Sequence, residues 1–245
     1  MSSFRIVPNP KWIRGVHRGA TVVDSRRASF VWEHRYYPQW YFPADDVAAE
    51  LQPNGHTFES SALGIGVRHD LVVDGEVLAD AAWSHPEAPD EELRGLVRFE
   101  WDAIEGWFEE DVEVFVHPRS PEVRVDVLPS SRHVVVEIDG ERLADSTSSR
   151  ILYETGLPER YYLPKSDVRM DLLAPTELVT ACPYKGWANY WTVTVGGAEH
   201  PNIAWGYRTP LPESRDVAGL VCFYNEQVDL IVDGEAQGRP VTKFS

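Results

Sequence analysis

Two side chains that could do chemistry lie three residues apart in the second half of the chain. Cys182 and Lys185 belong to the segment Cys182–Gly186, which we expect at the junction of a strand and a turn. A neighbouring ammonium favours the thiolate, which is the nucleophilic form of cysteine. In the alternative interpretation, Cys182 is a small buried apolar residue, Pro183 and Gly186 shape a turn, and Lys185 is solvated. Because the spacing fixes no general base beside them, we favour a structural or ligand-binding role over nucleophilic catalysis.

Aromatic residues are concentrated around this segment. They could line a pocket in which Arg160 and Lys185 act as cationic anchors, since ligand pockets are mostly apolar with few polar groups. They could also be core and cross-strand packing, and we expect this of most of them. The aromatic set comprises Tyr161, Tyr162, Tyr184, Trp187, Tyr190, Trp191, Trp205, Tyr207 and Tyr224. The candidate ligand-binding residues are Cys182, Tyr184, Lys185, Tyr190, Trp205 and Tyr207.

Other kinds of site find little support in the sequence. The eight histidines occur singly, without zinc-site spacing, and C-x-x-C is absent, so we expect no metal site and no cofactor. No serine lies in the G-x-S-x-G pattern of the nucleophile elbow. The acidic stretches Glu87–Glu92 and Glu109–Glu113 lack the spacing of a calcium loop, and we interpret them as solvated surface.

The composition limits the possible partners. A formal net charge of −16 disfavours nucleic acid and anionic membrane surfaces. No apolar run has the length of a membrane span or of a signal peptide core, and only two cysteines are present. We therefore expect a cytoplasmic protein. The one partner that we expect is an unidentified small molecule. The sequence leaves the oligomeric state open.

The chain contains an internal repeat. Asp24-Ser25 recurs 121 residues later as Asp145-Ser146, and Glu33 recurs at the same offset as Glu154. Further along, the offset becomes 122 for Trp83 and Trp205, and 124 for Gly95 and Gly219. A period of this length is typical of a duplicated domain rather than of a solenoid. We predict two homologous domains, residues 1–120 and 121–245, with the boundary around the proline-rich segment 117–121.

The two copies differ at the segment that carries the thiol and the amine. The offset of 121 places Ser61–Ile65 of the first copy opposite Cys182–Gly186 of the second. The first copy therefore lacks the Cys and the Lys, and we expect any site built on them to exist in the second copy only.

Short apolar runs predict a mostly β fold with little helix. Runs such as 191–195 and 228–232 have the length and composition of strands. Asp74-Gly75 and Asp139-Gly140 each separate two such runs, as in β-hairpins. The best candidates for helix are the segments that open with Pro43 and Pro164. We predict that each domain is a small twisted sheet or open barrel closed by hairpins, and that the two domains share one strand order.

Several motifs together resemble the domain of unknown function family 427, whose members are small β-rich proteins with one or two copies per chain. The second copy carries the intact pattern in Glu154–Pro158, Tyr161–Pro164, Cys182–Gly186, Tyr190-Trp191, Ala204–Tyr207 and Gly219–Tyr224. The resemblance implies two tandem copies, the first with a degenerate signature, and it implies no activity. Although a nucleotidyltransferase-like label has been attached to the family, no acidic triad or Gly-rich phosphate loop is present.

Three functional hypotheses follow. The leading one is small-molecule binding by the second copy, with a structural first copy. The second is an enzyme in which Cys182 or Lys185 forms a covalent intermediate. The third is a non-catalytic interaction scaffold.

Overall fold

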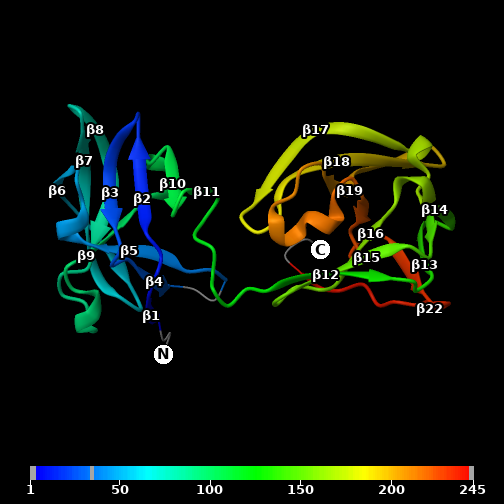
Figure 1. Ribbon diagram of the computed structural model, residues 1–245, viewed down its shortest axis with the longest axis horizontal. Helices are drawn as coiled ribbons and strands as arrows, with labels where there is room; N and C mark the ends of the chain where they lie inside the picture. The colour runs from blue at the N-terminus through cyan, green and yellow to red at the C-terminus, as the bar shows by residue number, and fades with distance from the viewer. Residues whose placement is uncertain (1–3, 34–35, 243–245) are drawn as a thin grey trace. The chain divides into compact units, whose positions relative to one another are not determined.

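The computed structural model describes residues 4–33 and 36–242. The chain divides into two compact units, residues 1–120 and 121–245. Within the described ranges, each unit contains one seven-stranded and one four-stranded antiparallel sheet (Figure 1). The predicted mostly β fold with two similar domains is confirmed, and the sheets are open rather than closed into barrels.

The first unit builds its sheets from strands that are distant in sequence. The order in the large sheet is β1 (Arg5–Pro8), β4 (Ser29–Trp32), β5 (Gln39–Pro43), β9 (Leu96–Phe99), β8 (Glu76–Ser84), β7 (Gly64–Val73) and β6 (Glu50–Ser60). The order in the small sheet is β11 (Val112–Val114), β10 (Gly106–Glu109), β2 (Ile13–His17) and β3 (Ala20–Ser25). Three 3-10 helices complete the unit, η1 (Ala44–Asp46), η2 (Glu91–Leu93) and η3 (Trp101–Ala103).

The second unit repeats this arrangement strand by strand. The order in its large sheet is β12 (Val125–Ser130), β15 (Ser149–Glu154), β16 (Arg160–Leu163), β20 (Val221–Phe223), β19 (Ala198–Tyr207), β18 (Gly186–Val195) and β17 (Leu173–Cys182). The order in its small sheet is β14 (Glu141–Ser146), β13 (Val134–Ile138), β21 (Asp229–Val232) and β22 (Glu235–Ala236). Its 3-10 helices are η4 (Lys165–Asp167), η5 (Met170–Leu172) and η6 (Pro212–Val217). The predicted common strand order is therefore confirmed.

The local signals for turns and helices have different outcomes. Asp74-Gly75 and Asp139-Gly140 form the predicted hairpin turns, and all four residues have the positive φ that such turns require. The segments that follow Pro43 and Pro164 form only single 3-10 turns, η1 and η4. Proline fixes its own φ and prepares the start of a helix, but the next residues, Val47 and Val168, are extended and form bridges to Val23 and Ala144, which end each turn.

The serines of the repeated Asp24-Ser25 and Asp145-Ser146 pairs fasten these 3-10 turns to the small sheets. The hydroxyl of Ser25 in β3 donates a hydrogen bond to the carboxylate of Asp46 in η1 at 2.5 Å. The hydroxyl of Ser146 in β14 donates in the same way to Asp167 in η4 at 2.6 Å. These landmarks of the repeat therefore have a structural role.

Each unit has a hydrophobic core between its two sheets. Alternate side chains of each strand face the core, as expected for a sheet with one covered face. In the second unit the core includes Leu163, Val193, Phe223, Val134, Val136 and Leu230. In the first unit it includes Phe42, Leu71, Val97, Ile13, Val22 and Trp107. Burial of each such side chain contributes about 1.5–3 kcal/mol to stability.

A second apolar cluster covers the opposite face of the large sheet in the second unit. Tyr162 lies on this face because its chain neighbours Tyr161 and Leu163 point into the core. Val217 of η6 packs on the same face. The buried members of this outer cluster are Leu152, Tyr162, Ala188, Tyr190, Trp205, Tyr207, Val217 and Cys222.

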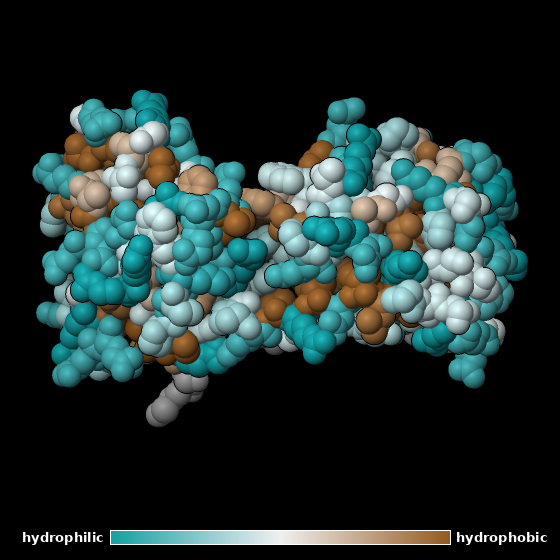
Figure 2. Space-filling model, in the orientation of Figure 1, coloured by the Kyte–Doolittle hydropathy of each residue, from teal (hydrophilic) through white to brown (hydrophobic). Residues whose placement is uncertain are grey.

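The surface is mainly hydrophilic, as Figure 2 shows for one side of each unit, with apolar side chains in smaller groups between the polar ones. No helix in the described part of the chain has the length and apolar character needed to cross a membrane.

Candidate functional site

The segment Cys182–Gly186 forms the turn between β17 and β18. Cys182 pairs with Gly186 across the hairpin, and the backbone N–H of Lys185 donates to the carbonyl of Cys182 at 3.2 Å. Gly186 has a φ of +98°, a conformation that favours glycine. The N–H of Leu211 donates to the carbonyl of Lys185 at 3.1 Å, which holds the turn against the chain that precedes η6. The predicted location at a strand-to-turn junction is thus what the structure shows.

Lys185 is buried and forms an ion pair with Glu154 at the end of β15. Its ammonium donates a hydrogen bond to Oε2 of Glu154, and the side chains are only 11% and 10% exposed. Burial acts to lower the pKa of Lys185, but Cys182 and Glu154 outweigh it, so the pKa lies above its ordinary value. Lys185 is therefore an ammonium at neutral pH, which disfavours a role for its amine as a nucleophile.

The two cysteines lie in different environments. Cys182 is free and partly exposed, and its side chain interacts with the Lys185 ammonium. Cys222 is free, fully buried in the outer cluster, and its pKa is raised to about 12 by burial.

The aromatic residues of the predicted site are packed in the outer cluster, whereas Trp187 of the wider aromatic set is 54% exposed and Tyr161 lies in the core. Tyr190, Trp205 and Tyr207 are 5–7% exposed and belong to the outer cluster. The hydroxyls of Tyr190 and Thr180 form a hydrogen bond at 2.8 Å, and Nε1 of Trp205 donates to the Tyr162 hydroxyl at 3.2 Å. Burial raises the pKa of Tyr207, and the nearby Cys182 adds to this effect.

The structure thus brings together part of the predicted site. Cys182, Lys185 and Tyr207 lie close to one another, and Tyr190 and Trp205 extend the same cluster along β18 and β19. Tyr184 is buried in the turn itself. Glu154, the partner of Lys185, is absent from the residues predicted for the site. Its recurrence as Glu33 in the repeat was the sequence signal that could have revealed it.

The hairpin register corrects the predicted correspondence between the copies. Ser60 pairs with Gly64 as Cys182 pairs with Gly186, so the offset here is 122 and not 121. The prediction that Ser61–Ile65 correspond to Cys182–Gly186 was therefore wrong by one residue. Ser60 occupies the position of Cys182, and Leu63 occupies that of Lys185. The absence of the Cys and the Lys from the first copy remains correct.

The first unit neutralises its equivalent carboxylate with a different residue. Nη1 of Arg98 in β9 donates to Oε1 of Glu33 at 2.5 Å, and the Tyr41 hydroxyl donates to the same atom at 2.9 Å. Arg98 pairs with Trp83 as Cys222 pairs with Trp205, so Arg98 occupies the position of Cys222. Leu63, at the position of Lys185, is a buried apolar residue. Both units therefore keep one carboxylate and one cation, but the cation comes from different strands.

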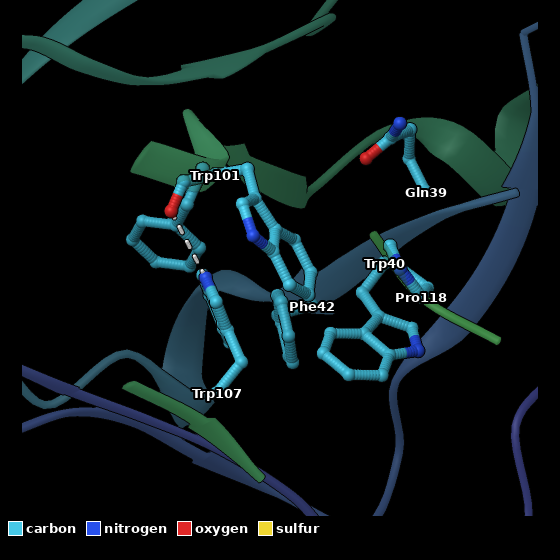
Figure 3. A pocket seen from close by; sticks show the side chains of 7 residues that line it. Gln39, Trp40, Phe42, Trp101, Trp107 and Pro118 are labelled. Atoms are coloured by element: carbon cyan, nitrogen blue, oxygen red, sulfur yellow. Dashed lines mark hydrogen bonds between the residues drawn. The ribbon is translucent and has the colours of Figure 1, made fainter. Parts of the chain in front are cut away.

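A small hollow in the first unit lies among aromatic side chains (Figure 3). Nε1 of Trp107 donates to the carbonyl of Trp101 at 3.2 Å beside it. Its volume of about 10 Å³ is the room of about one water molecule, whereas ligand pockets measure roughly 300–1,000 Å³. The hollow therefore offers no site for a small organic molecule. Its lining consists of Gln39, Trp40, Phe42, Phe99, Trp101, Trp107 and Pro118.

Comparison with known protein families shows the family to which the chain belongs. The sequence profile of the family described as Domain of unknown function (DUF427) matches residues 5–110 and 126–234. The chain belongs to this family. The two DUF427 segments fall one in each unit, as expected for two tandem copies. None of the curated proteins matches the chain. In the described part of both DUF427 copies, no three His, Cys, Asp or Glu side chains gather as metal ligands would.

Proposed function

We propose that the second DUF427 unit binds a small polar molecule at Lys185, Glu154 and Cys182. The observation that supports this is a buried ion pair beside a free, partly exposed thiol. Taking two charges out of water is costly, and well-packed apolar residues at such positions are often equally or more stable. The first unit forms the same hairpin with Leu63 at the position of Lys185, so the turn itself does not need a lysine.

The three groups define the chemistry of the ligand. The ammonium donates hydrogen bonds, the carboxylate accepts them, and charged groups make the stronger hydrogen bonds of a site. A molecule with both an acceptor and a donor fits this pair. Tyr190, Trp205 and Tyr207 hold the site from beneath, since they are too buried to line an open pocket.

One observation favours a second candidate function. Cys182 is free, partly exposed and next to an ammonium, which is a setting in which a thiol can add to an electrophilic substrate. In that case the ion pair would orient a carbonyl substrate, Sγ would bond to its carbon as the C=O π bond opens, and the thiol proton would pass to the oxygen.

The test compares a variant that copies the first unit with a matched control. Native mass spectrometry of the protein purified from its source would detect a retained ligand, and Lys185→Leu should lose it. Lys165→Ala removes an exposed lysine of the same unit and should retain the ligand. Lys185→Leu leaves the Glu154 carboxylate buried without its cation. The double variant Glu154→Gln/Lys185→Leu therefore removes both charges of the ion pair and is tested alongside it.

The outcomes separate the hypotheses. A ligand present in the parent and in Lys165→Ala, but lost from both Lys185 variants in folded form, supports the site. An adduct joined covalently at Cys182 favours the catalytic candidate. No retained molecule in the parent, or equal retention in the folded variants, means that the ion pair is architectural, and the proposal fails.

A further inference from the structure

A row of three side chains crosses the large sheet of the first unit on the face turned away from its core. Arg68 of β7 pairs with Trp83 of β8, and Trp83 pairs with Arg98 of β9. Both guanidinium groups lie over the indole ring, Arg68 at 4.6 Å and Arg98 at 4.4 Å from its centroid. The equivalent row in the second unit is Tyr190, Trp205 and Cys222, none of which is a cation, and the guanidinium of Arg160 in β16 lies 5.5 Å from the Trp205 ring centroid. The first unit is therefore chemically distinct here.

The two arginines differ in their partners. Arg98 is held by Glu33 at 2.5 Å. Arg68 forms no ion pair with any residue in the described ranges, and its hydrogen bond is a long one of 3.4 Å to the carbonyl of Asp80. Its planar face lies 4.8 Å from the Phe58 ring centroid as well as over Trp83. A guanidinium has five N–H groups, so the single long hydrogen bond leaves N–H groups for another partner, and the side chain stays charged at any physiological pH.

His85 adds a second polar group to the same face. It lies two residues after Trp83, is 1% exposed, and its ring is edge-on to Phe58 at 5.6 Å between centroids. Neither ring nitrogen makes a hydrogen bond of ordinary geometry within the part of the chain that the structure describes. Burial lowers the pKa of His85, so its ring is neutral and can donate or accept. Its ring interacts with the backbone of Gly64 and Ile65 instead, and a buried polar ring without a well-formed hydrogen bond is uncommon.

We propose that the first unit binds an oxyanion, the carboxylate or phosphate group of a small molecule, at Arg68 with Arg98 as the second cation. The planar fork of a guanidinium matches two oxygens of such a group, and charge-assisted pairs of this kind are the stronger ones. Glu33 pairs with Arg98, whereas the carboxylate nearest to Arg68, that of Asp80, is 47% exposed and pairs with His56, so the charge of Arg68 is only partly balanced in a chain of net charge −16. The distant acidic residues weaken binding only modestly, since salt screens charges beyond about 8 Å.

The test is a titration of the full chain with inorganic phosphate and, separately, with acetate. NMR of the arginine Nε–Hε groups and calorimetry would follow binding, and we expect a saturable shift at Arg68. Arg68→Gln should lower the affinity for the anion by about ten-fold or more, and Arg68→Lys should lower it less. Arg94→Gln, which removes an exposed arginine of the same unit, should bind as the parent does. The anion with the lower saturating concentration identifies the group.

Two results would overturn the proposed oxyanion site. The proposal is overturned if neither anion saturates the parent, or if folded Arg68→Gln binds as tightly as the parent does. If Arg68→Gln does not fold, binding by Arg68→Lys that is as tight as that of the parent overturns the proposal instead. Lys185→Leu in the second unit should leave this binding unchanged, so the outcome is independent of the function proposed above.

Discussion

Glu33 and Glu154 occupy equivalent positions, just after β4 and at the end of β15. Each carboxylate is largely removed from water and each has one cation, Arg98 in the first unit and Lys185 in the second. Removing a carboxylate from water is costly unless a positive charge lies nearby. The physical requirement therefore fixes the charge at this point of the fold, but it does not fix the strand that supplies the charge.

The two thiols should react at very different rates. Cys222 is 0% exposed with a pKa raised to about 12, so it presents neither access nor thiolate at pH 8. Cys182 is partly exposed in the hairpin turn. We expect iodoacetamide to modify Cys182 at least ten-fold faster, as measured by mass spectrometry of digests at successive times. The protein in urea is the control, in which both should react at similar rates. Equal rates in the folded protein would contradict the burial of Cys222.

Part of the site could be predicted from the sequence and part could not. Cys182 and Lys185 are neighbours along the chain, so their proximity follows from a tight turn. The contact between Lys185 and Glu154 joins the turn before β18 to β15, and three other strands separate β18 from β15 in the sheet. Such a contact depends on the tertiary fold, and no local pattern encodes it. The pairing of Arg98 with Glu33 escaped prediction for the same reason.

At the scale of elements, predictions from the conformational preferences of single residues were accurate. Predictions from the sequence offset between the two copies were less accurate. Asp-Gly turns follow from the φ that each residue can adopt, and both were correct. The register of the β6–β7 hairpin was wrong by one residue, because the second unit gains a residue near η5, before β17. A constant sequence offset between the copies misses a residue inserted in a loop, whereas the register of the paired strands reveals it.

A buried ion pair joins β16 to the turn after β20, and it predicts a pH dependence. Arg160 donates two hydrogen bonds of 2.7 Å to Glu226, and Thr242 adds one of 2.6 Å. Burial acts to raise the pKa of Glu226, but these donors outweigh it and the pKa lies below its ordinary value of 4.5. A carboxyl group with a lowered pKa stabilises the fold above pH 4.5, and this contribution is lost as the pH falls through the lower, folded value.

The variant Glu226→Gln should lose about 3–5 kcal/mol at pH 7, because Arg160 is left buried without its counter-ion. Its stability should also fall less than that of the parent between about pH 5 and the lower folded pKa. Urea unfolding at several pH values measures both effects. Asp229→Asn breaks the exposed pair with Arg239 and should cost less than about 1 kcal/mol. A Glu226→Gln protein as stable as the parent would show that the pair is not a structural link.

At the scale of the whole molecule, each unit contains a complete core. The residues of each hydrophobic cluster come from one unit, and each sheet is formed by strands of one unit. Each unit also has the size of an ordinary domain.

We therefore expect residues 121–245, expressed alone, to fold with native packing. Near-ultraviolet circular dichroism and a single cooperative urea transition would show this. The unit with Tyr162→Ala, which removes a fully buried ring from the outer cluster, is the destabilised reference and should lose about 3–5 kcal/mol. A molten or unfolded fragment would mean that the unit depends on the rest of the chain.

The different source of the cation in the two units makes their parts non-interchangeable. If the hairpins spanning 50–73 and 173–195 were exchanged, the first unit would hold a lysine and Arg98 around one carboxylate. The second unit would have only a leucine and Cys222 near Glu154, with no positive charge to balance it. Recombination between two such similar halves would thus give one unit with two cations around its carboxylate and one unit whose carboxylate has no cation. Either half could acquire the arrangement of the other only if the hairpin and the strand that carries Arg98 or Cys222 changed together.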